Sequence, residues 1–347
     1  MSVGKIKVFA STSFNRRRIL QLLGKSAQRK GHDCEIVEGF DYSECEVAVV
    51  WGLPKQKRGE SKASATRQKL RHGVFEQHRG GLVVVEAPVI GRRVQPLRER
   101  PKLISKIFPD AAPWTKMLFP QAKANTDRFA HYRIGFGGFP DDGGLALGPF
   151  CAGRWQSLSR KLGLPDVSPY RKTGQHILVI GQVPGDASLR GTDINQWVLN
   201  SCRQLRSLTD RPIIVRPHPL AADFAANGLP GKLSAIGVEI DDISRPLTAS
   251  LAGAWSVVTY SSGAAVDALI AGIPAISISP ASFAWEVTDH ALECALDPTL
   301  FERGPWLETI AATQWCEDEI ARGDVWEPLL KALAAGVPGR SAAQAAA

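Results

Sequence analysis

Arg216 and His218 are residue types that hold phosphate groups, and both follow the short apolar run 213–215. A proline stands on each side of the histidine and restricts the backbone there. Open parallel sheets bind ligands at the carboxyl ends of their strands, so a guanidinium and an imidazole at a predicted strand end indicate an anion site. The alternative interpretation is that His218 is a structural histidine.

A second polar turn follows the apolar run 256–259. Its residues are Tyr260, Ser261, Ser262 and Gly263. The segment 264–271 after it has the apolar spacing of a helix, and the first N–H groups of a helix can bind an anion. The alternative is that Ser261 and Ser262 only cap this helix.

A third polar turn follows the predicted strand 176–180. It contains Gln182, Asp186 and Ser188. Three such turns in one sheet predict a single binding edge with room for a phosphate group. Asp186 and Ser188 could instead do no more than close their own turn.

Two places in the first half of the chain offer a catalytic carboxylate. Glu86 directly follows the apolar run 82–85, and at a strand end it could accept a proton from an attacking hydroxyl. Its alternative role is a salt bridge to Arg92 or Arg93. Asp141 and Asp142, in a glycine-rich stretch that we interpret as loop, are the competing bases, although such a pair is often only solvated.

These residues lie on alternating predicted strands and helices, which indicates an α/β protein with parallel sheets. We predict an N-terminal Rossmann-like domain over 1–173, a C-terminal Rossmann-like domain over 174–335 and a flexible tail over 336–347. The 347 residues suit two domains of ordinary size. No apolar run is long enough to span a membrane, and the six cysteines show no Cys-x-x-Cys spacing, so we expect a cytoplasmic protein with reduced thiols.

Positive charge is concentrated in the first half. Up to residue 173 there are 31 Lys and Arg against 15 Asp and Glu, a net +16, and the remainder has 11 against 19, a net −8. This asymmetry predicts that the first half binds a polyanion, although a solvated surface is the alternative. The residues proposed to contact nucleic acid are Arg16, Arg17, Arg18, Lys55, Lys57, Arg58, Arg92 and Arg93.

Several enzyme classes lack their signatures in this sequence. There is no Gly-x-x-x-x-Gly-Lys-Ser/Thr loop, no complete Gly-x-Gly-x-x-Gly at a strand-to-helix turn and no Gly-x-Ser-x-Gly elbow. A P-loop nucleotidase, a dinucleotide-dependent enzyme and an α/β-hydrolase are therefore not expected.

Two α/β domains with a phosphate site in the second resemble the GT-B glycosyltransferases. His218-Pro219, Ser261-Ser262 and the run 181–188 are similar to motifs of capsular Kdo transferases and polysialyltransferases. The resemblance implies two domains facing a central cleft, C-terminal helices that cross back to the first domain, and a nucleotide-sugar donor whose phosphate is held by His218, Ser261 and Ser262. UDP is the expected nucleotide, with CMP or GDP as alternatives, and no metal is required.

Segments 50–54, 85–88, 90–93, 313–315 and 319–320 resemble phage-encoded glycosyltransferases. This resemblance implies transfer of a sugar to a 5-hydroxymethylpyrimidine in double-stranded DNA, in the host cytoplasm. Trp51 or Phe136 would then stack on a flipped base or fill its place. The alternatives are a capsular or other anionic glycan as acceptor, a DNA-binding protein without catalysis on the same scaffold, and an epimerase of related fold.

Overall fold

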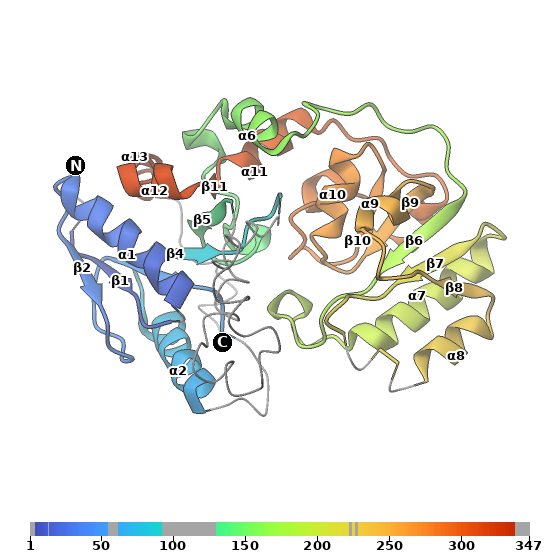
Figure 1. The fold of residues 1–347 in the computed structure, drawn as a ribbon, viewed down its shortest axis with the longest axis horizontal. Coiled ribbons are helices and arrows are strands. Elements are labelled where there is room, and N and C mark those ends of the chain that lie inside the picture. Colours follow the sequence, from blue (N-terminus) through green and yellow to red (C-terminus); the bar gives the residue numbers. More distant parts are fainter. Residues whose placement is uncertain are drawn as a thin grey trace, which may run out of the picture. The chain divides into compact units, whose positions relative to one another are not determined.

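The computed structural model describes residues 4–12, 14–54, 62–91, 130–221, 224–225 and 228–336, without the side chains of Phe14 and residues 62–67. The chain forms two compact units (Figure 1). Unit 1 takes its described residues from Met1–Gly52, Ser61–Gly137 and Thr313–Arg340, and unit 2 takes them from Leu53–Glu60 and Gly138–Ala312. Residues 138–173 therefore group with the second unit, whereas the sequence placed the boundary at 173.

Unit 1 contains a six-stranded sheet in the order β11-β5-β4-β3-β1-β2. The strands are β1 (Ile6–Phe9), β2 (Cys34–Val37), β3 (Val47–Trp51), β4 (Gly81–Glu86), β5 (Tyr132–Phe136) and β11 (Gln314–Trp315). The first four are parallel, while β5 runs antiparallel to both β4 and β11. β5 lies where the sequence predicted loop, because its flanking glycines concealed the short apolar alternation of Tyr132, Ile134 and Phe136.

The last helices of the chain pack on the first one. Unit 1 contains α1 (Phe14–Arg29), α2 (Lys62–Gln77), α12 (Glu317–Arg322) and α13 (Trp326–Ala334). The indole Nε1 of Trp326 donates to the carbonyl of Leu23, at 3.2 Å, and to the hydroxyl of Ser26, at 3.0 Å. These bonds join α13 to α1, so the predicted return of the C-terminal helices to the first domain is confirmed.

Unit 2 contains a five-stranded parallel sheet in the order β10-β9-β6-β7-β8. The strands are β6 (His176–Ile180), β7 (Ile213–Arg216), β8 (Val238–Ile240), β9 (Ala254–Thr259) and β10 (Ala275–Ser277). The chain builds β6, β7 and β8 in one direction and then places β9 and β10 on the other side of β6. The side on which new strands are added therefore changes between β6 and β9, although all strands stay parallel. Such a topological switch point is where open α/β sheets bind ligands.

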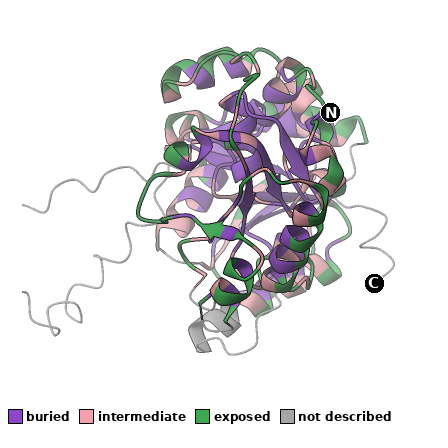
Figure 2. Cartoon of the chain, turned by 90° about the vertical axis from the view of Figure 1, so that its right-hand side faces the viewer, coloured by how far each residue is buried: buried purple, intermediate pink, exposed green. Residues whose placement is uncertain are grey.

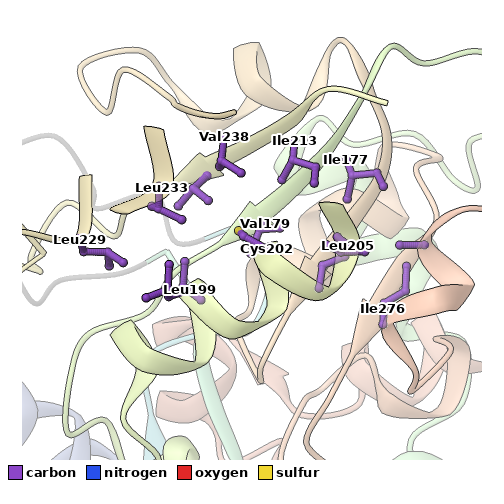
Figure 3. Packing of buried hydrophobic residues seen from close by; sticks show 14 of the residues in the cluster. Ile177, Val179, Leu199, Cys202, Leu205, Ile213, Leu229, Leu233, Val238 and Ile276 are labelled. Carbon is purple, nitrogen blue, oxygen red and sulfur yellow. The ribbon is translucent and has the colours of Figure 1, made fainter. Parts of the chain in front are cut away.

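Four of the described helices of unit 2 pack against its sheet, namely α7 (Ile194–Leu208), α8 (Leu229–Ser234), α9 (Leu247–Leu251) and α10 (Ala264–Ile270). Two more helices, α6 (Arg154–Leu162) and α11 (Gly304–Ala311), pack against each other. Asp193 caps α7, because its carboxylate accepts from the N–H groups of Asn195 and Gln196. On one face, Leu199, Cys202 and Leu205 of α7 pack with strand residues such as Ile177 and Val179 (Figure 3).

The inner strands of the two sheets are buried, the edge strands β2 and β8 are partly exposed, and the helices expose their outer faces (Figure 2). The α/β class with two Rossmann-like sheets is therefore confirmed. All six cysteines are free thiols, and burial raises the pKa of Cys202 to about 12. None of the described helices is both long enough and apolar enough to span a membrane.

Candidate functional site

The three predicted turns of unit 2 follow three adjacent strands, because β6 lies between β9 and β7. The N–H of Gly181, just after β6, donates to the carbonyl of Arg216 at 2.9 Å. A Cβ atom added at Gly181 would lie 3.8 Å from the backbone nitrogen of His218. The next residue, Gln182, contacts Ser261 at the end of β9. The turns after β7 and β9 therefore meet on the Gly181-Gln182 dipeptide.

A buried hydrogen-bond network joins the turn after β6 to the turn after β9. Nε2 of Gln182 donates to the hydroxyls of Ser188 and Ser261, at 3.1 Å each. Oε1 of Gln182 accepts from the N–H of Ser261 at 2.8 Å, and the two serine hydroxyls lie 2.9 Å apart. All three residues are 5–7% exposed. The network holds the turns after β6 and β9 together at the switch point. Its members therefore position these turns, and their polar atoms are used within the network.

The other residues of the turn after β6 also bond within unit 2. The carboxylate of Asp186 accepts from both the N–H and the hydroxyl of Ser188, at 3.0 and 2.8 Å, so it closes its turn. The hydroxyl of Thr192 donates to the phenol oxygen of Tyr260 at 2.9 Å, and the Tyr260 ring packs edge-on against Trp197. Tyr260 therefore holds the end of this turn against β9.

Ser262 and Gly263 present the groups that the network leaves available. The Ser262 hydroxyl is half-buried and accepts from the N–H of Ala264 at 3.3 Å, which is a capping interaction. In the described part of the chain, neither the N–H of Ser262 nor that of Gly263 makes a hydrogen bond. These two backbone donors are the clearest anion ligands of the turn.

His218 is half-buried, and its ring has a defined orientation. Nδ1 accepts from the N–H of Leu220 at 3.1 Å. A ring nitrogen that accepts from a backbone N–H carries no proton, so the neutral ring is protonated at Nε2. The ring can therefore donate a hydrogen bond from Nε2 to an anion.

Arg216 does not provide the cation that the sequence predicted. Its guanidinium is buried and donates to the carboxylate of Asp241, to the hydroxyl of Ser250 and to the carbonyl of Arg245. Burial alone would raise the pKa of Asp241, but hydrogen bonds from Ser250 and Arg216 outweigh it and hold that pKa below its ordinary value. The predicted contact between Arg216 and a phosphate group is therefore corrected, since this side chain stabilises the ends of β7 and β8.

Glu86, the predicted base, is half-buried at the end of β4. Its Oε2 lies 3.2 Å from Nη2 of Arg133, its direct cross-strand neighbour on β5. The sequence alternative, a pair with Arg92 or Arg93, involves residues outside the described part of the chain. A Cβ atom added at Gly52 would lie 3.7 Å from Cζ of Arg71 and 3.8 Å from Oε1 of Glu86, so both side chains lie beside Gly52.

Asp141 and Asp142 have different environments. The carboxylate of Asp142 is buried and accepts from the N–H groups of Gly138 and Phe139, at 2.8 and 2.5 Å, so it shapes the loop. The carboxylate of Asp141 forms an ion pair with Arg190 at 2.7 Å. Both partners belong to unit 2, and neither aspartate is simply solvated.

The predicted nucleic-acid contacts are only partly within the described residues. The Arg16 guanidinium lies 5.5 Å from the ring centre of Trp51, Arg17 pairs with Glu38, and Arg18 pairs with Glu317. Lys55, Lys57, Arg58, Arg92 and Arg93 lie outside the described part of the chain. Contact with nucleic acid stays a prediction for all eight residues.

The aromatic residues proposed to stack on a base are buried in unit 1. Trp51 is 5% exposed and packs edge-on against Tyr132, and Phe136 is 0% exposed. Neither ring is accessible to a base in this structure. The expectation that they stack on a flipped base does not agree with this packing.

Sequence reasoning missed the long-range contacts of Arg190, Thr192 and Arg133. Each acts through a partner that is distant in sequence, namely Asp141, Tyr260 and Glu86. The left-handed backbone of Arg190 has no sequence signal except the glycine after it. Their roles could be found only once the fold brought these partners together.

No protein-family model and no curated protein matches the chain. Among solved structures it is similar to the Thermosulfurimonas dismutans KpsC beta Kdo 2,4 transferase, with 15% identity over 90% of this chain and 91% of that chain and a TM-score of 0.48. The beta Kdo 2,7 transferase of the same KpsC gives 16% identity over 94% and 98%, with a TM-score of 0.47. The Methanocaldococcus jannaschii UDP-GlcNAc 2-epimerase gives 11% over 89% and 98%, with a TM-score of 0.30. Identities and TM-scores of this size do not establish a family.

Proposed function

We propose that this chain is a nucleotide-sugar-dependent glycosyltransferase that binds its donor at the carboxyl edge of the unit 2 sheet. The observation that carries the proposal is the buried network of Gln182, Ser188 and Ser261 at the topological switch point. Such a network fixes two loops at the place where α/β sheets bind ligands. It also leaves the N–H groups of Ser262 and Gly263 to bind an anion.

The chemistry follows from these groups. An acceptor hydroxyl oxygen forms a bond to the anomeric carbon of the sugar, and the bond between that carbon and the phosphate oxygen breaks. The electron pair leaves with the nucleotide. Nε2–H of His218 and the N–H groups of Ser262 and Gly263 stabilise the charge on the departing phosphate. Glu86 is the proposed acceptor of the hydroxyl proton.

For the acceptor we propose DNA that contains 5-hydroxymethylpyrimidine. The proposal rests on the net +16 of residues 1–173 and on the sequence resemblance to phage-encoded enzymes. An anionic glycan of the capsular type is the second candidate, because it would also be attracted by this charge. A gel shift with duplex DNA in graded salt separates them, since phosphate contacts give binding that weakens steeply as salt rises. Absence of a shift at low salt rejects the DNA acceptor.

The activity itself is tested with a panel of donors and acceptors. The protein is incubated with UDP-, GDP- and CMP-sugars and with hydroxymethylated DNA or an anionic glycan, and the products are weighed by mass spectrometry. We expect one pair to gain the mass of a sugar. A DNA-binding protein without catalysis would give no product with any donor. An epimerase would isomerise the nucleotide sugar without an acceptor.

A further inference from the structure

Arg190 has an unusual backbone conformation beside the candidate donor site. Its φ is 48°, and among the described residues it is the only non-glycine with a positive φ. Left-handed backbone is unfavourable for a residue with a side chain, and such outliers are concentrated at functional sites. The following residue, Gly191, is also left-handed, with φ 87°. The chain therefore turns sharply at Arg190.

The turn at Arg190 is held on both sides by the site. Two residues before it, the hydroxyl of Ser188 bonds to Ser261. Two residues after it, the hydroxyl of Thr192 bonds to Tyr260. Because residues 188 and 192 are both fixed to the turn after β9, the backbone of Arg190 is fixed next to that turn.

The side chain of Arg190 remains accessible. It is 49% exposed, whereas the side chain of its partner Asp141 is 23% exposed. Nη2 of Arg190 lies 2.8 Å from Oδ1 and 2.7 Å from Oδ2 of Asp141. Asp142 holds the Asp141 loop rigid by accepting from two backbone N–H groups. The guanidinium therefore has a defined position, but solvent reaches it.

We propose that Arg190 is the cation that binds the anionic group of the donor, and that Asp141 is the counter-ion that orients it when no donor is bound. The inference rests on the proposed function and deepens it. A cation is needed because the guanidinium of Arg216 is engaged by Asp241, and the turn after β9 supplies only neutral donors. A half-exposed ion pair is weak, so a phosphate group can replace Asp141 as the partner of Arg190.

The test compares Arg190→Gln with Asp141→Asn in the full chain. Glutamine keeps an extended polar side chain and the same backbone restriction, but it removes the charge. Calorimetric titration gives the dissociation constants for UDP, GDP and CMP and for the matching nucleosides. We expect Arg190→Gln to weaken the preferred nucleotide about 10- to 100-fold, as for a lost charged hydrogen bond, and to leave its nucleoside unchanged. Asp141→Asn should bind the nucleotide at least as tightly as the wild type, because a competing anion is gone.

The expected changes in nucleotide affinity differ between the two variants, and this difference distinguishes a ligand role of Arg190 from a structural one. Equal weakening in both variants means that the ion pair only holds the loop, which overturns the inference. If Arg190→Gln keeps its nucleotide affinity and the wild type still prefers nucleotide over nucleoside, the role of Arg190 is overturned but the proposed donor site is not. A wild type that shows no such preference rejects the proposed donor site as well. Arg322→Gln is the matched control, because Arg322 is a half-exposed arginine in unit 1 paired with Asp324 at 2.7 Å.

Discussion

Replacing Gln182 by methionine tests the network that defines the candidate site. Methionine keeps the length of the side chain and removes its hydrogen bonds, so the change isolates the polar interactions from the packing. The N–H of Ser261 then loses its acceptor at 2.8 Å. The hydroxyls of Ser188 and Ser261 still bond to each other at 2.9 Å, so they are not left without a partner. One buried backbone donor is therefore unsatisfied.

An unsatisfied buried donor costs about 1–3 kcal/mol. For a unit of this size each kcal/mol lowers the melting temperature by about 2–4 °C, so we expect the unit 2 transition to fall by about 2–12 °C. Differential scanning calorimetry of the whole chain measures this shift, and the unit 1 transition should stay unchanged. Nucleotide affinity should fall too, because the turns after β6 and β9 are no longer fixed to each other.

Gln196→Met is the control for this experiment. Gln196 is an exposed glutamine on α7 whose Nε2 donates to Oδ1 of Asn200 at 2.8 Å. Its replacement should change the free energy of unfolding by less than about 0.5 kcal/mol. If Gln182→Met has the same melting temperature as Gln196→Met and binds nucleotide like the wild type, the network does not define the site.

Four further predictions follow from the same contacts. Arg216→Met removes one hydrogen-bond partner of the buried Asp241, which keeps Arg245 and Ser250, so urea denaturation should show a loss of about 1–3 kcal/mol, while the protein that remains folded should keep its nucleotide affinity; a loss of affinity without a loss of stability would restore Arg216 as a ligand. His218→Ala should lower kcat about 10²- to 10³-fold in the transfer assay, and full activity would reject its role. Glu86→Gln should lower kcat about 10²- to 10⁴-fold with a small change in KM, and an unchanged rate would show that another group takes the proton. Burial lowers the pKa of His176, so the stability from its neutral form is fully present above the ordinary value of 6.5 and is lost as pH decreases through the lowered pKa. The free energy of unfolding should therefore fall less between pH 8 and pH 5 in His176→Leu than in the wild type, and equal slopes would contradict the assignment.

The positions of the three turns could be predicted from the sequence because each follows a continuous apolar run. Such runs indicate buried parallel strands, and parallel strands present their carboxyl ends at one edge. The direction in which a side chain points at a strand end could not be predicted from these runs. Arg216 was predicted to face a ligand, but Asp241 at the end of β8 is close enough to bind it. A contact between residues 25 positions apart has no local signal.

The environment of each candidate carboxylate could not be predicted from the sequence either. Glu86 faces Arg133 because β5 pairs antiparallel with β4, and β5 itself was obscured by the surrounding glycines. Asp141 and Asp142 are adjacent in sequence, yet one shapes its loop and the other pairs with Arg190. Neighbours in a tight turn point in different directions, so residue type alone could not separate their roles.

The claim that a donor binds at the carboxyl edge of unit 2 is tested most directly by hydrogen exchange. Mass spectrometry would follow the amides of the full chain with and without UDP, GDP and CMP. The account predicts that the nucleotide that binds slows exchange in segments 181–192, 216–221 and 259–265, with the N–H groups of Ser262 and Gly263 among those protected. Binding that protects only unit 1, or no binding by any of these nucleotides, would contradict it.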